Sequence, residues 1–223
     1  MRSKSVLLAS LLVLQAFTTF AIAITPETIT IDGDLSEWSI DSNLQTDSNS
    51  VTFSVTWDSQ NMYVAWNGTD WSSTSEGADL FIYFNTSSGG SILSKNWNFA
   101  HTLPFAADYG FVLEDSSYSS IVSFDGTSWE DQSTNVDTFT GWSENKVTEI
   151  SIPWESIGSP SSLDFMAYAQ WEDAGNVWTA FPTNNPASSN GAETFTHAWH
   201  IDNVSNATNP SNLPIRETTN AEK

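Results

Sequence analysis

The feature that most constrains the fold of this chain is the regular alternation of apolar and polar residues within short runs. The run VTFSVTW, residues 51–57, places valine, phenylalanine, valine and tryptophan on one side of an extended chain and three hydroxyl residues on the other. Successive side chains of a β-strand point to opposite faces, so this pattern predicts a strand with one buried face. The run NMYVAW begins after only three residues, which predicts a hairpin.

Similar runs recur along the chain and are separated by clusters of Gly, Asn, Ser and Asp. They predict further strands at residues 28–31, 80–84, 109–113, 119–124, 146–152, 165–171, 177–181 and 194–200. The segment IPWESIG has room for one helical turn, and no longer helix is indicated. Many short strands joined by polar turns are typical of an all-β fold. We therefore expect an antiparallel β-sandwich of the jelly-roll or immunoglobulin type in a single domain.

The two ends of the chain differ from this central pattern. Two basic residues precede an apolar run, and the small-residue triplet at 21–23 follows it, so residues 1–23 are predicted to be a secretory signal peptide. The apolar run is shorter than the ~20 residues of a spanning helix, so we expect no membrane span and a secreted or cell-surface location. Residues 24–202 form the predicted sandwich, and residues 203–223 lack periodicity and are predicted to be a flexible polar tail.

The chain is strongly acidic, with 27 Asp and Glu against six Lys and Arg and a formal net charge of −21. Nucleic acids and anionic lipids need positive charge to offset phosphate, so this balance argues against both as partners. The negative charge does not exclude cations or neutral molecules as ligands. The chain has no cysteine, so a secreted sandwich of this sequence must be stabilised by packing, or by bound ions, and not by disulfides.

The stretch IDGDLSEW, residues 31–38, crowds Asp32, Asp34 and Glu37 around one glycine and one tryptophan. Their spacing does not match an EF-hand loop, which has oxygen ligands at alternate positions and a later glutamate. We expect a tight turn at the Asp-Gly pair, with the Trp38 ring packed against the sandwich. Calcium binding by the three acids is the alternative.

Four segments in order, IDGDLSEW, SVTWDSQNMYVAWNGTD, ADLFIYFNT and GWSENKVTEISIPWESIG, resemble the successive strands of the family-nine carbohydrate-binding modules and the wider DOMON-like sandwiches. The resemblance covers residues 29–158. The DG-x-x-x-EW opening and the E-I-x-I-P-W strand are specific for the superfamily but not for its ligand. The resemblance implies a secreted, non-catalytic β-sandwich, with sugar binding as the best-known activity and calcium as a frequent structural companion.

The chain contains eleven tryptophans, more than core packing usually requires. Sugars stack on aromatic faces through their C–H surfaces, while amides and carboxylates bind their hydroxyls. The resemblance implies two tryptophans that clamp a terminal sugar, and Trp71 and Trp171 are the plausible counterparts by position. The other predicted sugar ligands are Glu172, Asp173, Asn176, Trp178 and Trp97, with Trp129 next in line. Ordinary packing is the alternative for each loop ring, and it is the expected role of Trp38, Trp57, Trp66 and Trp154.

Two other classes of function compete with the binding of an oligo- or polysaccharide. Some DOMON-like domains hold haem between an axial Met and His. Met62 with His197 or His200 could supply such a pair, and Met166 or His101 are further options. Met62 alternates with core residues, however, so we expect no haem. Glycan acceptor sequons begin at Asn67, Asn85, Asn203 and Asn206. They suit a structural or adhesive subunit of a cell surface or extracellular filament. The sequence does not decide whether such a subunit associates with copies of itself.

Catalysis is not predicted. Glu149 and Glu155 are a tempting carboxylate pair for glycoside hydrolysis, but closeness in sequence says nothing about the separation across a cleft that this chemistry requires. Glu149 alternates with Ser151 on the polar side of its strand, and the sequence shows no nucleophile elbow or triad. The sequence thus predicts a secreted, non-catalytic glycan-binding module, with the surface or filament subunit as the alternative.

Overall fold

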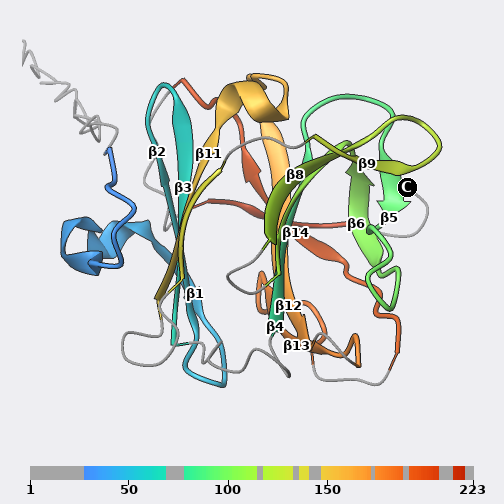
Figure 1. Cartoon of the computed structure of the whole chain (residues 1–223), viewed down its shortest axis with the longest axis horizontal. Coiled ribbons are helices and arrows are strands. Elements are labelled where there is room, and N and C mark those ends of the chain that lie inside the picture. The colour runs from blue at the N-terminus through green and yellow to red at the C-terminus, as the bar shows by residue number, and fades with distance from the viewer. Residues whose placement is uncertain are drawn as a thin grey trace, which may run out of the picture.

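The structure, a computed structural model of the chain, describes residues 28–68, 78–114, 118–132, 136–140, 147–171, 174–187, 191–205 and 213–218. Two antiparallel sheets pack face to face, and a third, two-stranded layer covers the far face of the larger sheet (Figure 1). The predicted all-β antiparallel sandwich in a single domain is confirmed. The predicted signal peptide, residues 1–23, lies outside the described residues. No helix in the described ranges has the length and hydropathy needed to cross a bilayer.

The smaller sheet has the strand order β1-β2-β3-β11-β10. Its strands are β1 (Asn43–Thr46), β2 (Thr52–Trp57), β3 (Asn61–Asn67), β10 (Asp137–Thr140) and β11 (Val147–Pro153). β2 and β3 form the predicted hairpin, in which Val55 lies opposite Val64. Asp58 closes the turn, because its Oδ1 accepts the backbone N–H groups of Gln60 and Asn61 at 2.7 Å each. This turn fixes the register that buries the apolar face of the hairpin.

The larger sheet has the strand order β15-β14-β12-β4-β7-β8-β9, and β13 also pairs with β12. Its strands are β4 (Ala78–Asn85), β7 (Tyr109–Glu114), β8 (Tyr118–Phe124), β9 (Trp129–Asp131), β12 (Leu163–Trp171), β13 (Val177–Phe181), β14 (His197–Ile201) and β15 (Ile215–Glu217). The central pair, β4 and β12, stays in register from Asp164 opposite Asn85 to Trp171 opposite Ala78. β4 is buried along nearly its whole length, because both faces of this sheet are covered.

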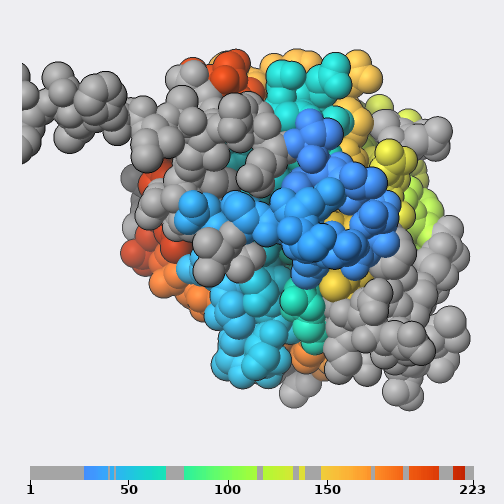
Figure 2. Space-filling model, turned by 90° about the vertical axis from the view of Figure 1, so that its left-hand side faces the viewer, coloured from blue at the N-terminus to red at the C-terminus, as the bar shows by residue number. Residues whose placement is uncertain are grey.

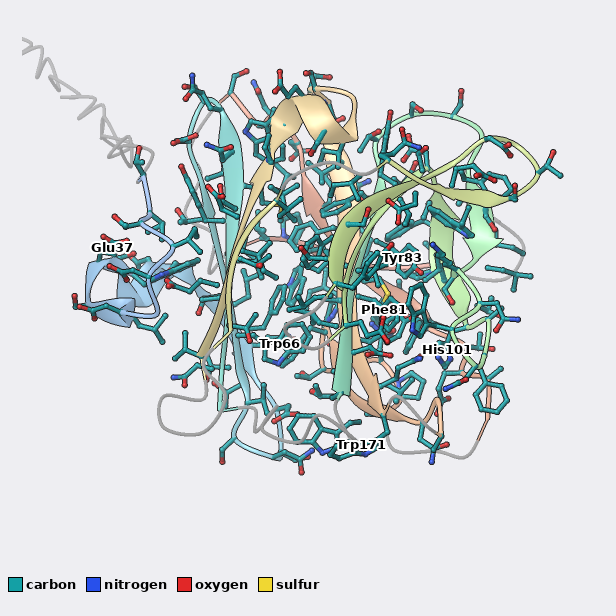
Figure 3. The ribbon with its side chains drawn as sticks, in the orientation of Figure 1. Glu37, Trp66, Phe81, Tyr83, His101 and Trp171 are labelled. Atoms are coloured by element: carbon teal, nitrogen blue, oxygen red, sulfur yellow. The ribbon has the colours of Figure 1, made fainter. Side chains whose placement is uncertain are left out.

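The core between the two sheets is built on aromatic rings. Phe53 of the smaller sheet stacks on Trp199 of the larger sheet, with ring centroids 5.5 Å apart and planes 4° apart. It also stacks on Phe181, at 5.2 Å and 19°. Trp66 packs edge-on against Phe53 and Phe181, and it lies between the sheets in Figure 3. Each of these rings is at most 2% exposed, so this cluster joins the sheets through a fully buried contact.

The third layer consists of β5 (Ser91–Leu93) and β6 (Thr102–Ala107). Leu103 and Phe105 of β6 pack with Phe81 and Tyr168 of the larger sheet in a second apolar cluster. This cluster lies on the face of the larger sheet that is turned away from the smaller one. Neither β5 nor β6 is predicted from the sequence, because their apolar residues do not alternate over a long enough run.

Residues 28–42 cover the outer face of the smaller sheet, where they form the blue surface in Figure 2. They contain two 3-10 helices, η1 (Leu35–Glu37) and η2 (Ile40–Ser42). The strand predicted at residues 28–31 does not form. A third 3-10 helix, η3 (Trp154–Ile157), follows β11 and is the helical turn predicted in IPWESIG.

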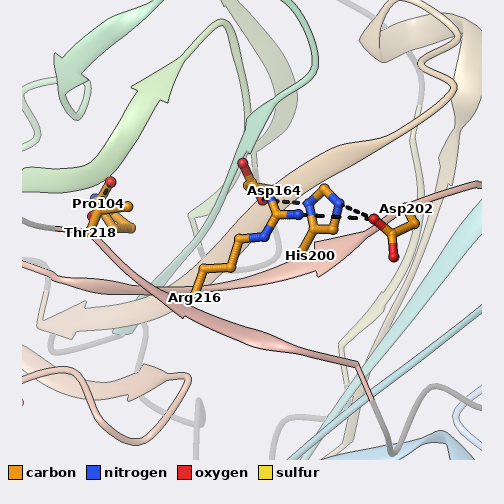
Figure 4. Close-up of polar contacts among 6 residues, drawn as sticks. All are labelled: Pro104, Asp164, His200, Asp202, Arg216 and Thr218. Atoms are coloured by element: carbon orange, nitrogen blue, oxygen red, sulfur yellow. Dashed lines mark hydrogen bonds and ion pairs between the residues drawn. The ribbon is translucent and has the colours of Figure 1, made fainter. Parts of the chain in front are cut away.

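The C-terminal residues differ from their prediction. Residues 203–223 are predicted to be a flexible tail, but Ile215–Glu217 form β15, which pairs antiparallel with β14 (Figure 4). Directly after β15, Thr218 donates its backbone N–H to the carbonyl of Thr196 at 2.9 Å and its hydroxyl to the carbonyl of Pro104. The alternation pattern misses this strand because all three of its residues are exposed. Its pairing depends on the edge of β14, which local sequence cannot reveal.

Replacing Phe53 with alanine should lower the free energy of unfolding by about 3–5 kcal/mol, the range for truncating a fully buried phenylalanine. The loss combines the buried area of the ring with the cavity left beside Trp199 and Phe181. Urea unfolding followed by fluorescence measures it. The control is Ile92→Ala, at a side chain that is 40% exposed, and it should change stability by less than about 0.5 kcal/mol. Equal effects of the two variants would contradict the role given to the Phe53 cluster.

Candidate functional site

Two tryptophans lie beside each other at one end of the sandwich. Trp171 ends β12 and Trp178 is the second residue of β13. Their ring centroids are 5.7 Å apart, and the ring planes are tilted by 47°. Trp171 is 37% exposed, and it lies at the lower end of the sandwich in Figure 3. Trp178 packs partly against the core between the sheets. The pair thus offers aromatic surface to a ligand from outside.

A tight turn between β12 and β13 brings the two rings together. The backbone N–H of Trp171 donates to the carbonyl of Asn176 at 3.0 Å, and the N–H of Gly175 donates back to the carbonyl of Trp171 at 2.7 Å. Gly175 has a φ of +64°, a left-handed conformation that glycine adopts without strain. A Cβ at this position would also approach the Phe99 ring to 2.5 Å. The sequence AGN therefore encodes the turn that places Trp171 at the end of its strand.

A β-bulge directs Trp178 toward the space between the sheets. Gln170 pairs with Val177, but the preceding residue, Ala169, pairs with Thr179. Trp178 is the extra residue, so it does not follow the simple alternation of its strand. Val177 consequently packs in the outer apolar cluster while Trp178 packs against the inter-sheet core. The bulge is a tertiary feature, and the period-two pattern of the sequence does not show it.

A cleft of ≈ 640 Å³ opens beside Trp178. It lies between the residues that follow β1 in the smaller sheet and β13 in the larger one. The Trp178 ring forms part of its wall, together with the exposed polar side chains of Thr46, Ser48, Asn49 and Thr183. Asp47 is the only ionisable residue among the described residues that line the cleft. The lining suits a ligand with many hydroxyl groups and no net charge.

Asp47 holds the polar wall of this cleft in place. Its Oδ1 accepts the backbone N–H groups of Asn49 and Val51 at 2.8 and 2.9 Å. Its Oδ2 accepts the hydroxyl of Thr179, from the opposite wall, at 2.6 Å. These bonds fix the turn after β1 and tie the two sheets together across the cleft. The exposed side chains of Ser48 and Asn49 therefore have a preformed backbone, which reduces the ordering needed on binding.

The structure brings only part of the predicted sugar site together. Trp171, Trp178 and Asn176 all lie on the β12–β13 hairpin, and the carbonyl of the half-buried Asn176 is bonded to Trp171. Trp71, Glu172 and Asp173 lie outside the described residues. The predicted pairing of Trp71 with Trp171 thus stays a prediction, while the structure supplies Trp178 as the ring beside Trp171.

Trp97 lies apart from this pair, on the outer face of the larger sheet. Its ring packs edge-on against Phe81 at 6.2 Å and stacks on Tyr118 at 5.9 Å. The ammonium group of Lys95 lies 5.1 Å from its centroid. Trp129 lies in the same outer cluster, where its Nε1 donates to the carbonyl of Leu93 at 3.0 Å. These contacts give Trp97 and Trp129 packing roles.

The tryptophans expected to pack inside the sandwich do so to different extents. Trp57 and Trp66 are 2% and 0% exposed, as the alternation of their strands predicts, and Trp154, the first residue of η3, is 6% exposed. Trp38 is only half-buried, and its ring does not enter the inter-sheet core. It lies instead on the outer face of the smaller sheet, where its indole N–H is hydrogen-bonded.

The acids of the N-terminal segment cap backbone groups. Asp32 Oδ1 accepts the N–H of Asp34 at 2.9 Å, and Asp34 Oδ1 accepts the N–H of Ser36 at 2.9 Å, at the start of η1. Glu37 Oε1 accepts the N–H of Thr30. In the ranges that the structure describes, no three His, Cys, Asp or Glu side chains come together to hold a metal ion. The turn expected at the Asp-Gly pair is present, and its three acids stabilise it.

The group that holds this turn is Glu149, which the sequence places on a polar strand face. That assignment is correct, but residues 28–42 cover the face, and Glu149 is fully buried. Its Oε2 accepts the backbone N–H groups of Asp32 and Gly33 at 3.1 and 2.5 Å, and its Oε1 accepts the indole N–H of Trp38 at 2.7 Å. Burial raises the pKa of Glu149, although these hydrogen bonds offset part of the rise. In the sequence, the only sign of this contact is a carboxylate within a largely apolar strand. The sequence does not show which groups it binds.

The residues considered as haem ligands have other contacts, and the sequon asparagines differ in exposure. Met62 is fully buried between the sheets. His197 Nδ1 lies 2.9 Å from the Thr196 hydroxyl, and His200 lies between two carboxylates, 2.7 Å from each (Figure 4). Among the sequons, the asparagines at positions 67 and 203 are exposed and the one at position 85 is half-buried; Asn206 lies outside the described residues.

Searches with this chain against protein-family models, curated proteins and solved structures find no match. What the site does must therefore be inferred from its own residues.

Replacing Glu149 with glutamine should release the N-terminal segment. The amide group would turn an N–H donor toward the indole or backbone N–H groups that Glu149 now accepts, so we expect a loss of about 1–3 kcal/mol. Urea unfolding and hydrogen exchange at the amides of Asp32 and Gly33 measure it. Glu155→Gln, the same change at an exposed position of η3, should have little effect. If both variants match the wild type, Glu149 does not anchor the segment.

Proposed function

We propose that this protein is a non-catalytic glycan-binding module and that its binding site is the cleft beside Trp178. The observation that carries the proposal is the tilted pair of Trp171 and Trp178 next to a cleft with a wall of hydroxyl and amide side chains. A sugar ring has apolar C–H faces and a polar rim, and it needs both kinds of surface at once.

The exposure of Trp171 supports this proposal. A tryptophan ring that is 37% exposed leaves apolar area in contact with water, and an inward orientation would bury it. The turn at Gly175 instead holds Trp171 near the surface, and the bulge turns the half-buried Trp178 toward the edge of the inter-sheet core, where it lines the cleft. Strand irregularities of this kind often aim side chains at binding sites.

The chemistry of the cleft supports a neutral ligand. Asp47 has both carboxylate oxygens occupied by hydrogen bonds within the protein, so it is poorly placed to bind a cation. The described basic residues, Lys95 and Arg216, lie elsewhere: Lys95 is beside Trp97, and Arg216 is bonded to Asp164. Thr46, Ser48, Asn49 and Thr183 can both donate and accept hydrogen bonds, as sugar hydroxyls require.

The resemblance of residues 29–158 to family-nine carbohydrate-binding modules and DOMON-like sandwiches points the same way. A structural or adhesive subunit of a cell surface or filament is the second candidate. The observation that favours it is β15, an edge strand with all three residues exposed, which could pair with another chain. Exposed sequons at Asn67 and Asn203 are compatible with either function.

Alanine substitution of Trp178 or Trp171 should weaken glycan binding by about 1–3 kcal/mol, roughly 5- to 150-fold, because each removes one stacking surface. Isothermal titration against short plant, algal and microbial oligosaccharides, with and without calcium, measures it. Trp97→Ala is the matched control, since that ring packs on the other face of the larger sheet, and its affinity should match the wild type. Wild-type binding that only Trp97→Ala weakens would move the site to the outer face.

The cleft should also discriminate between neutral and acidic glycans. At low salt we expect binding of neutral oligosaccharides and at least tenfold weaker binding of uronic-acid or sulfated ones, because no described lining residue offers a positive charge. Asn49→Lys, at the rim of the cleft, should raise affinity for the acidic ligands. Ser88→Lys adds the same charge at an exposed turn outside the cleft lining and should not. Equal binding of both ligand classes by the wild type would contradict this selectivity.

A further inference from the structure

The outer layer, defined here as residues 91–107 together with residues 191–196, closes over the far face of the larger sheet. Its two segments meet in a short pairing, where Thr102 N–H donates to the carbonyl of Glu193 at 2.8 Å and Phe195 N–H donates to the carbonyl of Thr102 at 2.9 Å. His101, next to this pairing, is fully buried. In Figure 3 it lies on the same side of the larger sheet as Phe81 and Tyr83.

His101 joins both segments of the layer to the sheet. Its Nδ1 accepts the backbone N–H of Glu193 at 3.0 Å. The ring proton is therefore on Nε2, which donates to Gln170 Oε1, on β12, at 3.0 Å. Gln170 Nε2 in turn donates to the carbonyl of Trp97 at 2.6 Å. One chain of hydrogen bonds thus connects residues 191–196, His101, the larger sheet and the loop after β5.

The groups around His101 leave no place for a second ring proton. On β12, Gln170 already receives the Nε2 proton, and the Tyr168 ring lies edge-on at 5.1 Å. On the 191–196 segment, the Phe195 ring lies 5.7 Å away. From residues 91–100, Ser94 Oγ accepts the backbone N–H of His101 at 2.9 Å, and the charged group of Lys95 lies over Trp97.

Two carboxylates lie in the neighbouring residues. Asp79 on β4 is opposite Gln170 and is buried. Glu193 is also buried, and its Oε1 has no hydrogen-bond partner among the described residues. His101 hydrogen-bonds to the backbone of Glu193 and to neither carboxylate. Burial lowers the pKa of His101, and the hydrogen bond that its Nε2 donates to Gln170 Oε1 offsets only part of this effect.

A second proton on His101 would break the chain of bonds. It would have to bind Nδ1, the atom that accepts the Glu193 N–H, so that two N–H donors would face each other. A histidine with a lowered folded pKa contributes stability that is fully present above its unfolded value of about 6.5. That contribution is lost as the pH falls from this value toward the folded pKa. Acid therefore acts against the closed layer.

We propose that His101 is a proton-sensitive lock, which holds the outer layer closed on the larger sheet at neutral pH and releases it when the pH falls below the ordinary histidine range. Opening uncovers the apolar face that Phe81, Tyr83 and Tyr168 contribute to the outer cluster. The Phe53 cluster between the sheets contains neither His101 nor its partners, so the sandwich stays assembled when the layer opens. The residues of the lock do not line the glycan cleft, and the lock does not depend on the proposed function.

Hydrogen exchange tests the lock on the full chain. Protection factors, corrected for the intrinsic effect of pH, are compared between pH 7.5 and pH 5 for residues 101–107 and 191–196, with residues 52–66 as the internal reference. In the wild type, protection of the outer layer should fall by up to about tenfold per pH unit below the histidine range, the limit for the uptake of one proton. Protection of β2 and β3 should change little.

His101→Gln is the informative variant, because a glutamine can accept from Glu193 and donate to Gln170 but does not titrate. It should keep the layer closed at both pH values. His197→Gln and His200→Gln remove the other two histidines of the chain and should behave as the wild type. Three outcomes would overturn the proposal. The wild-type layer could be equally protected at both pH values, His101→Gln could lose protection in acid as the wild type does, or His200→Gln could abolish the acid response.

NMR titration of the wild-type imidazole gives a second readout that does not depend on a variant that folds. A midpoint for His101 below about 6.5 supports the lock. A midpoint above that value would show that the closed layer takes up the proton, and it would overturn the proposal.

Discussion

The larger sheet is apolar on both faces, and much of the architecture follows from the need to cover both of them. One face packs on the smaller sheet through Phe53, Trp66 and Trp199, and the other packs under the outer layer through Phe81 and Tyr168. A single sandwich partner cannot cover both faces. The chain therefore gives residues 91–107 and 191–196, the outer layer, to the second cover, and Leu103, Phe105 and Phe195 are its apolar contacts with the sheet.

Both covers are attached through a buried polar side chain that accepts backbone N–H groups. Glu149 holds the N-terminal segment over the smaller sheet, and His101 holds the outer layer over the larger one. In both covers these hydrogen bonds fix the position of the backbone over the sheet. Burial disfavours charge on both groups, since it raises the pKa of Glu149 and lowers the pKa of His101. A fall in pH therefore favours the protonated form of Glu149 that burial prefers, while it opposes the neutral form of His101.

Alternation of side chains predicts the strands of the inter-sheet core and the β2–β3 hairpin, because burial of one face acts on every second residue. It does not predict β15, whose exposed residues pair through the backbone alone, or the bulge that turns Trp178. For the candidate site, the number of tryptophans draws attention to the end of β12, where Trp171 is exposed. The partner ring and the wall at Asp47 come from β13 and from the end of β1. Sequence cannot show that these two segments meet across the edges of two sheets.

β13 packs both against the core between the sheets and against the outer cluster. Its bulge turns Trp178 toward the core between the sheets, where Phe181 also packs, while Val177 and Ala180 pack in the outer cluster under the second cover. The strand that forms one wall of the cleft is therefore supported from behind by the outer layer. On the cleft side the Thr179 hydroxyl donates to Asp47, and just after the strand the N–H of Thr183 donates to Gln45. These hydrogen bonds tie the wall to the smaller sheet. Closure of the outer layer, which depends on a neutral His101, thus contributes to the rigidity of the wall that carries Trp178.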